Sequence, residues 1–100
     1  MRVSFERTGG LMGRKVNFSV DLDELSNDQA GTLKGLLKKA DFFNLPENLI
    51  SSPAPDEFSY FITVETAIQQ HGIRFSDTSM TESLRLLVDN LYMQARSGKT

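Results

Sequence analysis

Four short segments of the chain alternate between apolar and polar residues, and this pattern constrains the fold more strongly than any other feature. Alternation with a period of two is typical of a β-strand that buries one face. Because all four segments are apolar on one face only, we expect an antiparallel sheet that is covered on a single side. The positions that share the apolar face are Val3 and Phe5; Val16, Phe18 and Val20; Phe58, Tyr60, Ile62 and Val64; and His71, Ile73 and Phe75.

The reversal between the third and fourth strands has two positions that the sequence allows. A turn near Thr66 and Ala67 places His71 on the same face as Ile73. A turn at His71 and Gly72 leaves the fourth strand short. We favour the earlier turn because it gives two strands of matched length.

Each pair of strands is followed by a segment with helical periodicity. Ser26 with Gln29, and Ser79 with Glu82, have the spacing of a capping box, in which the serine accepts from exposed amides of the first turn. The apolar stripes that follow are Ala30, Leu33, Leu36, Leu37 and Ala40 in the first helix, and Met80, Leu84, Leu87, Val88, Leu91 and Ala95 in the second.

The order of elements is therefore ββαββα. This order predicts an α+β fold in which a four-stranded antiparallel sheet carries two helices packed on one face. The 100 residues have the size of a single domain, spanning 1–100. Gly31 and Gly35 lack side chains, and we expect them to let the first helix lie close to the sheet.

Three connections are expected to meet at one end of this sheet. The first is the glycine-rich connection between the first two strands. The second is the proline-rich segment 46–57, which starts near the same end if the first helix returns there. The third is the connection 76–79 after the fourth strand. Such a cluster of connections is the layout of a binding rim on a rigid scaffold.

The composition argues against several classes of function. The net charge is -2 and the basic residues are scattered, so no nucleic-acid-binding face is expected. The chain has no cysteine and a single histidine, His71, so we expect no enzymatic activity, no metal site and no cofactor. The N-terminus lacks a signal peptide, and no window approaches the ~18 apolar residues of a membrane span. We therefore expect a cytoplasmic protein that binds no membrane.

The connection between the first two strands contains two large apolar residues among its glycines. Gly9, Gly10 and Gly13 suit a hairpin, because glycine adopts the positive φ that tight turns need. Leu11 and Met12 are not required by the turn. Either they fold back over the end of the sheet, or they are presented to a partner. An extended, apolar, glycine-flanked peptide suits the groove of an endopeptidase.

Several segments together resemble the emfourin family. They are Val3–Gly13, Ala40–Pro46, the strands Phe58–Glu65 and Ile73–Phe75, and the last helix with Met80, Leu84 and Leu87. Emfourins are small bacterial proteins that inhibit protealysin-like and other thermolysin-like zinc metalloproteinases. The resemblance implies that the chain is such an inhibitor, that its partner is the protease, and that it blocks the active-site cleft with surface loops. We expect the free inhibitor to be a monomer.

The resemblance also implies where the protease is bound. Leu11 or Met12 would occupy the pocket that receives the residue after the cleaved bond, and a backbone carbonyl or a nearby carboxylate would approach the zinc. The other predicted contacts lie on either side of Leu11 and Met12. The candidate protease-binding residues are Gly9, Gly10, Leu11, Met12, Gly13, Ser52, Pro53, Asp56, Glu57 and Asp77. The alternative is a non-inhibitory interaction module or regulatory subunit that uses the same exposed loop.

Overall fold

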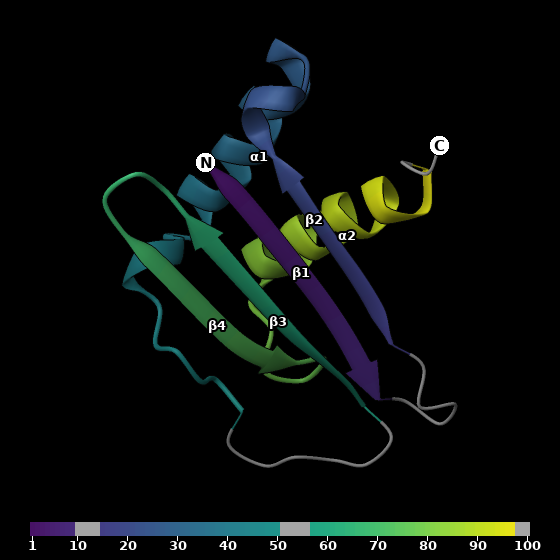
Figure 1. Ribbon diagram of the computed structural model, residues 1–100. Coiled ribbons are helices and arrows are strands. Elements are labelled where there is room, and N and C mark those ends of the chain that lie inside the picture. The colour runs from purple at the N-terminus through teal and green to yellow at the C-terminus, as the bar shows by residue number, and fades with distance from the viewer. Residues whose placement is uncertain (10–14, 51–56, 98–100) are drawn as a thin grey trace.

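The structure is a computed structural model that describes residues 1–9, 15–50 and 57–97. Its elements follow the predicted ββαββα order, which confirms the α+β class (Figure 1). The strands are β1 (Arg2–Gly9), β2 (Val16–Asp21), β3 (Phe58–Glu65) and β4 (Gln70–Ser76), and the helices are α1 (Asn27–Lys39) and α2 (Glu82–Ser97). Two short 3-10 helices, η1 (Leu22–Glu24) and η2 (Phe42–Asn44), flank α1.

The four strands form one antiparallel sheet in the order β2-β1-β3-β4. Its register places Phe5 opposite both Phe18 and Ile62, and Ile62 opposite Ile73. One apolar residue from each strand therefore lies in a single row across the sheet. Because side chains alternate between faces along a strand, the same register aligns the remaining apolar positions on that face as well.

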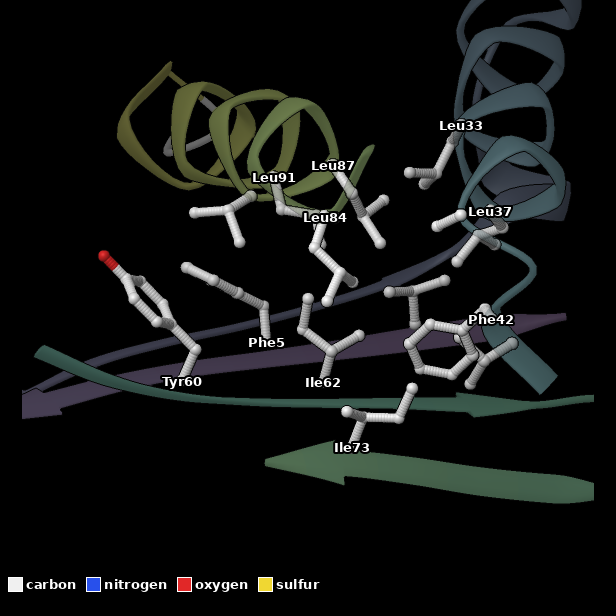
Figure 2. Packing of buried hydrophobic residues seen from close by; sticks show 14 of the residues in the cluster. Phe5, Leu33, Leu37, Phe42, Tyr60, Ile62, Ile73, Leu84, Leu87 and Leu91 are labelled. Atoms are coloured by element: carbon white, nitrogen blue, oxygen red, sulfur yellow. The ribbon is translucent and has the colours of Figure 1, made fainter. Parts of the chain in front are cut away.

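Both helices pack on this apolar face, as predicted. Figure 2 shows leucines of α1 and α2 pointing toward the side chains of the strands. The core continues to the end of α1, where Phe42 of η2 is 1% exposed. The buried apolar residues are Val3, Phe5, Leu22, Leu33, Leu37, Ala40, Phe42, Tyr60, Ile62, Val64, Ile73, Phe75, Leu84, Leu87, Val88 and Leu91.

Of the two helix caps that the sequence predicts, the structure has one. At α1 the prediction is confirmed, since the Ser26 hydroxyl accepts from the N–H of Gln29 at 3.1 Å. At α2 it is wrong. The Thr81 hydroxyl accepts from the N–H of Leu84 at 3.1 Å, and the helix begins after Thr81. The Ser79 hydroxyl instead accepts from the last backbone N–H of β4 at 2.8 Å, because the turn after β4 brings it there.

The glycines of α1 do not bring the helix closer to the sheet. A Cβ built at Gly31 or Gly35 would meet no atom within 4 Å, and both residues are exposed. The expectation of a close approach is therefore wrong. The contact with the sheet is made by Leu33 and Leu37, on the opposite side of the helix.

The β3–β4 turn lies at the earlier of the two positions. β3 ends at Glu65, β4 begins at Gln70, and the N–H of Thr66 donates to the carbonyl of Gln69 at 2.8 Å. His71 is consequently on the same face as Ile73, and its ring contacts the aromatic side chains of η2. The prediction of two strands of similar length is confirmed.

The segment after η2 runs along the outer edge of β4. Asn48 pairs with Arg74 in parallel, the Leu49 N–H donates to the Arg74 carbonyl at 2.8 Å, and the Arg74 N–H donates to the Glu47 carbonyl at 2.8 Å. The His71 Nε2 donates to the carbonyl of Leu45 at 2.8 Å. These bonds satisfy backbone groups that an uncovered edge strand would expose.

This course corrects the expected path of the proline-rich segment. We expected it to start at the end of the sheet where β1 ends. It starts beside His71, which pairs with Val64 and through it lies level with Val3, near the start of β1. α1 therefore ends at the far end of the sheet, and residues 45–49 run back along β4 from the level of His71 to that of Arg74.

Two kinds of feature are absent from the described part of the chain. None of its helices is long and apolar enough to cross a membrane. Among residues 1–9, 15–50 and 57–97, no group of three or more histidine, aspartate or glutamate side chains is arranged to hold a metal ion.

Candidate functional site

The described ends of three connections lie at one end of the sheet, as predicted. Gly9, the last residue of β1, pairs with Phe58 at the start of β3, and Ser59 pairs with Ser76 at the end of β4. Figure 1 shows these strand ends together at the lower end of the sheet, away from the N-terminus. We call the described residues Gly9, Glu57, Phe58 and 76–79 the rim. It is the only part of the predicted site that the structure describes.

Gly9 occupies a position that suits glycine for two reasons. Its φ is +96°, a backbone conformation that residues with a side chain rarely adopt. A Cβ at this position would also lie 2.9 Å from the carbonyl oxygen of Glu57, which is closer than real contacts allow. The glycine therefore lets β1 and the start of β3 approach each other where the predicted site begins.

Asp77 uses both carboxylate oxygens inside the protein. Its Oδ2 accepts from the backbone N–H of Phe58 at 3.1 Å, and its Oδ1 accepts from the Tyr60 hydroxyl at 2.7 Å. The two donors belong to β3, whereas Asp77 belongs to the connection between β4 and α2. The carboxylate therefore ties this connection to the first residues of β3.

Glu57, the residue before β3, accepts hydrogen bonds from the β4–α2 connection. Its carboxylate accepts from the backbone N–H and the hydroxyl of Thr78, each at 3.0 Å. The hydrogen bond from the Thr78 N–H lowers the pKa of the Glu57 carboxyl below its usual value, against a partly opposing effect of desolvation. Glu57 is thus a carboxylate at neutral pH, held against the β4–α2 connection.

Tyr60 is the buried residue whose hydroxyl donates to Asp77. Burial of the side chain, together with the hydrogen bond to Asp77 and the charge of that carboxylate, raises the pKa of Tyr60 to about 12, while the guanidinium of Arg7 acts in the opposite direction. The hydroxyl stays protonated at neutral pH and donates to Asp77. Its ring stacks against Phe5 and Phe75, with centroids 6.3 and 5.3 Å away.

Arg7 lies beneath the rim and is a residue that sequence reasoning missed. Its guanidinium carbon is 4.3 Å from the centroid of the Phe58 ring and 4.4 Å from that of Tyr92 on α2. The signal was present in the alternation of β1, where Arg7 follows Val3 and Phe5 on the face that becomes the core. A charged residue on an apolar face requires partners, and here the partners are aromatic rings.

The structure brings together the described part of the predicted site. Gly9, Glu57 and Asp77, which are far apart in the sequence, lie around the start of β3. Sequence reasoning missed the roles of Tyr60 and Tyr92, because these roles depend on partners that are remote in the chain. The predicted residues that lie outside the described part of the chain are Gly10, Leu11, Met12, Gly13, Ser52, Pro53 and Asp56.

His71, the single histidine, lies away from the rim. It donates to a backbone carbonyl and stands 5.8 Å from Phe42 and 6.3 Å from Phe43, measured between ring centroids. Its surroundings are those of a residue that packs the end of α1 against β4. The described rim offers hydrogen-bonding groups and a fixed backbone, which suit the recognition of a partner surface.

Comparison with known families identifies a match over most of the chain. The family model described as Emfourin matches residues 5–92, from within β1 to within α2, so the match includes the whole rim. This confirms the resemblance that the sequence segments indicated. No curated protein and no solved structure matches the chain.

Proposed function

The chain belongs to the emfourin family of metalloproteinase inhibitors, and from this premise we propose that its target is a thermolysin-like zinc metalloproteinase whose active-site cleft it blocks. The observation that carries the proposal is the family match over residues 5–92. In this proposal the rim faces the protease, the inhibitor has no catalytic activity of its own, and it acts as a monomer.

The rim supports the proposal because it anchors both candidate segments at neighbouring points. Residues 10–14 follow Gly9, and residues 51–56 precede Glu57, whose carbonyl oxygen is close to Gly9. The anchor points are held by the Glu57–Thr78 and Asp77–Phe58 hydrogen bonds. Fixing the anchors before the encounter lowers the ordering cost of binding.

Leu11 and Met12 are the residues that we assign to the protease pocket. They lie outside the described residues, so this assignment rests on their apolar side chains and on the family resemblance. One of them would fill the pocket for the residue after the cleaved bond. The second, or the backbone beside it, would complete the contact.

The contacts of the rim narrow the choice of the group that approaches the zinc. Glu57 and Asp77 both accept hydrogen bonds from within the protein, and Asp77 has both oxygens engaged. Drawing either carboxylate to the zinc would leave its donors unsatisfied, which is unfavourable for buried groups such as the Tyr60 hydroxyl. We therefore assign the approach to a backbone carbonyl of residues 10–12 or to the Asp56 carboxylate.

The test is inhibition of a purified thermolysin-like protease, followed by hydrolysis of a fluorogenic peptide. The chain is expected to abolish activity near a stoichiometric ratio. Replacing Leu11 and Met12 together by glycine should raise the inhibition constant tenfold or more, which corresponds to about 1.4 kcal/mol or above. The matched control is Ile68→Gly, which removes a side chain that is 90% exposed in the turn at the opposite end of the sheet, and it should inhibit like the original protein.

The outcomes separate the parts of the proposal. Unchanged inhibition by a folded double variant would show that Leu11 and Met12 do not fill the protease pocket. The proposal that the chain inhibits the protease would still stand. Steady protease activity at excess inhibitor, with or without degradation of the chain, would reject this class of protease as the target. In that case the interaction-module alternative would replace it.

A further inference from the structure

The guanidinium of Arg7 lies between two aromatic rings from different parts of the fold. Its central carbon is 4.3 Å from the ring centroid of Phe58 in β3 and 4.4 Å from that of Tyr92 in α2. Its Nη2 also donates to the Tyr92 hydroxyl at 3.3 Å. A planar guanidinium can stack on rings and donate hydrogen bonds at its edge at the same time.

Among the described residues, Arg7 forms no ion pair with a carboxylate. Its half-buried charge is therefore balanced by the faces of the rings and by hydrogen bonds, which makes the contact geometry strict. The strand register places Arg7 directly opposite Tyr60, whose hydroxyl donates to Asp77. Asp77 in turn accepts from the Phe58 N–H, so the contacts form a closed ring through β1, β3 and the β4–α2 connection.

This ring of contacts lies next to Gly9 and Glu57, which are the two anchor points. Arg7 is two residues before Gly9, and Phe58 is the residue after Glu57. The same side chain thus fixes the end of β1 to the start of β3 and both to α2. Loss of its planar stacking would let these three elements shift relative to each other while the core below remained packed.

We infer that Arg7 is a positioning residue of the inhibitor, which holds the end of β1 and the start of β3 in the arrangement that the protease binds. The inference rests on the proposed function. Arg7 itself does not touch the protease. If the binding-competent arrangement is populated only in part, the apparent affinity falls by the same fraction.

The experiment compares Arg7→Lys with a matched substitution elsewhere. Lysine keeps the charge and loses the planar fork, so Arg7→Lys is expected to raise the inhibition constant about tenfold, as it would if one molecule in ten were competent. The matched control is Arg74→Lys. Arg74 also stacks on an aromatic ring, Phe61 at 4.9 Å, but it lies at an exposed position of β4 outside the rim. Arg74→Lys should inhibit like the original protein.

A second readout distinguishes positioning from a general loss of stability. Hydrogen exchange of the free protein should become about tenfold faster at the Phe58 N–H in Arg7→Lys, and stay unchanged at the Leu49 N–H, which donates to the Arg74 carbonyl. Val64→Ala serves as a variant destabilised throughout, because Val64 is fully buried near the opposite end of β3. It should accelerate both amides and change inhibition little while it remains folded.

Three results would overturn the inference. One is unchanged inhibition by folded Arg7→Lys, which would leave the proposed function standing. Another is equal acceleration at both amides, which would make Arg7 a purely structural residue. If the original protein inhibits no thermolysin-like protease, the proposed function fails by itself, and unchanged exchange at Phe58 would then overturn the positioning role separately.

Discussion

The two ends of the sheet are closed by hydrogen bonds of very different reach. At the β3–β4 turn, the Thr66 hydroxyl accepts from the N–H groups of Ile68 and Gln69, two and three residues away. At the rim, Asp77 accepts from donors 17 and 19 residues away, and Glu57 accepts from Thr78, 21 residues away. The turn is held by its own residues, whereas the rim is held by residues that only the fold brings together.

This difference explains why the rim is suited to recognition. A local turn keeps its shape wherever its four residues are placed, so it does little to orient other segments. The long-range bonds of the rim orient the end of β1, the start of β3 and the start of α2 relative to one another. Positions fixed in this way remain accurate only while the sheet and α2 are correctly packed.

The largest expected effect comes from removing the central acceptor of the rim. Asp77→Ala leaves the Tyr60 hydroxyl and the Phe58 N–H without their partner, and hydrogen bonds to a charged group contribute about 1.5–3 kcal/mol. We expect the free energy of unfolding in urea to fall by about 2–3 kcal/mol. Asp89→Ala, at an exposed position of α2, is the control and should cause no such loss. Equal stability of the two variants would contradict a stabilising role for the hydrogen bonds that Asp77 accepts.

An intermediate effect is expected for Tyr60→Phe. The substitution keeps the stacked ring and removes one donor to Asp77, so the free energy of unfolding at neutral pH should fall by about 1 kcal/mol. Because the folded pKa of Tyr60 is raised to about 12 from about 10, its stabilising contribution is complete below pH 10 and is lost as the pH rises through about 12. The advantage of the original protein over Tyr60→Phe should therefore disappear in that interval. Urea unfolding of both proteins across this range measures it, and a constant difference would argue against the shift.

The smallest effect is expected at the turn. Thr66→Ala removes a hydroxyl whose partners are exposed and can bond to water, so the free energy of unfolding should fall by only about 0.5 kcal/mol. Thr66→Ser keeps the hydroxyl and should restore most of the loss. Neither variant should change protease inhibition. A change in inhibition similar to that of a rim variant would show that the two ends are not independent.

The parts of the fold that the sequence predicted correctly depend on neighbours in the chain. The strands follow from alternation, the α1 cap from the spacing of Ser26 and Gln29, and the β3–β4 turn from matched strand lengths. The prediction for the α2 cap was wrong although Ser79 has Glu82 at the capping-box position, where Thr81 has Leu84. The choice between them was made by β4, whose last N–H is bonded to Ser79.

The candidate site could be predicted in outline only. Clustering of the three connections follows from antiparallel order, and it was predicted although the path assumed for residues 45–49 was wrong. The hydrogen bonds that the Glu57 and Asp77 carboxylates accept were not predictable, since their donors are 17–21 residues away. Arg7 gave a signal through its place on an apolar face, but the sequence does not name its aromatic partners.

The sequence by itself determined which residues form strands and helices, which face of each is buried, and the family to which the chain is similar. The first two properties rest on periodicity and on local hydrogen bonding, which act within a few residues, whereas the family similarity rests on matching segments in order along the chain. Only the tertiary structure decided that β1 lies between β2 and β3, that residues 45–49 cover the edge of β4, and that Arg7, Glu57 and Asp77 join the strand ends into a rim. The physical reason is that such contacts form only after the strands have paired, because their partners are separated by many residues of chain.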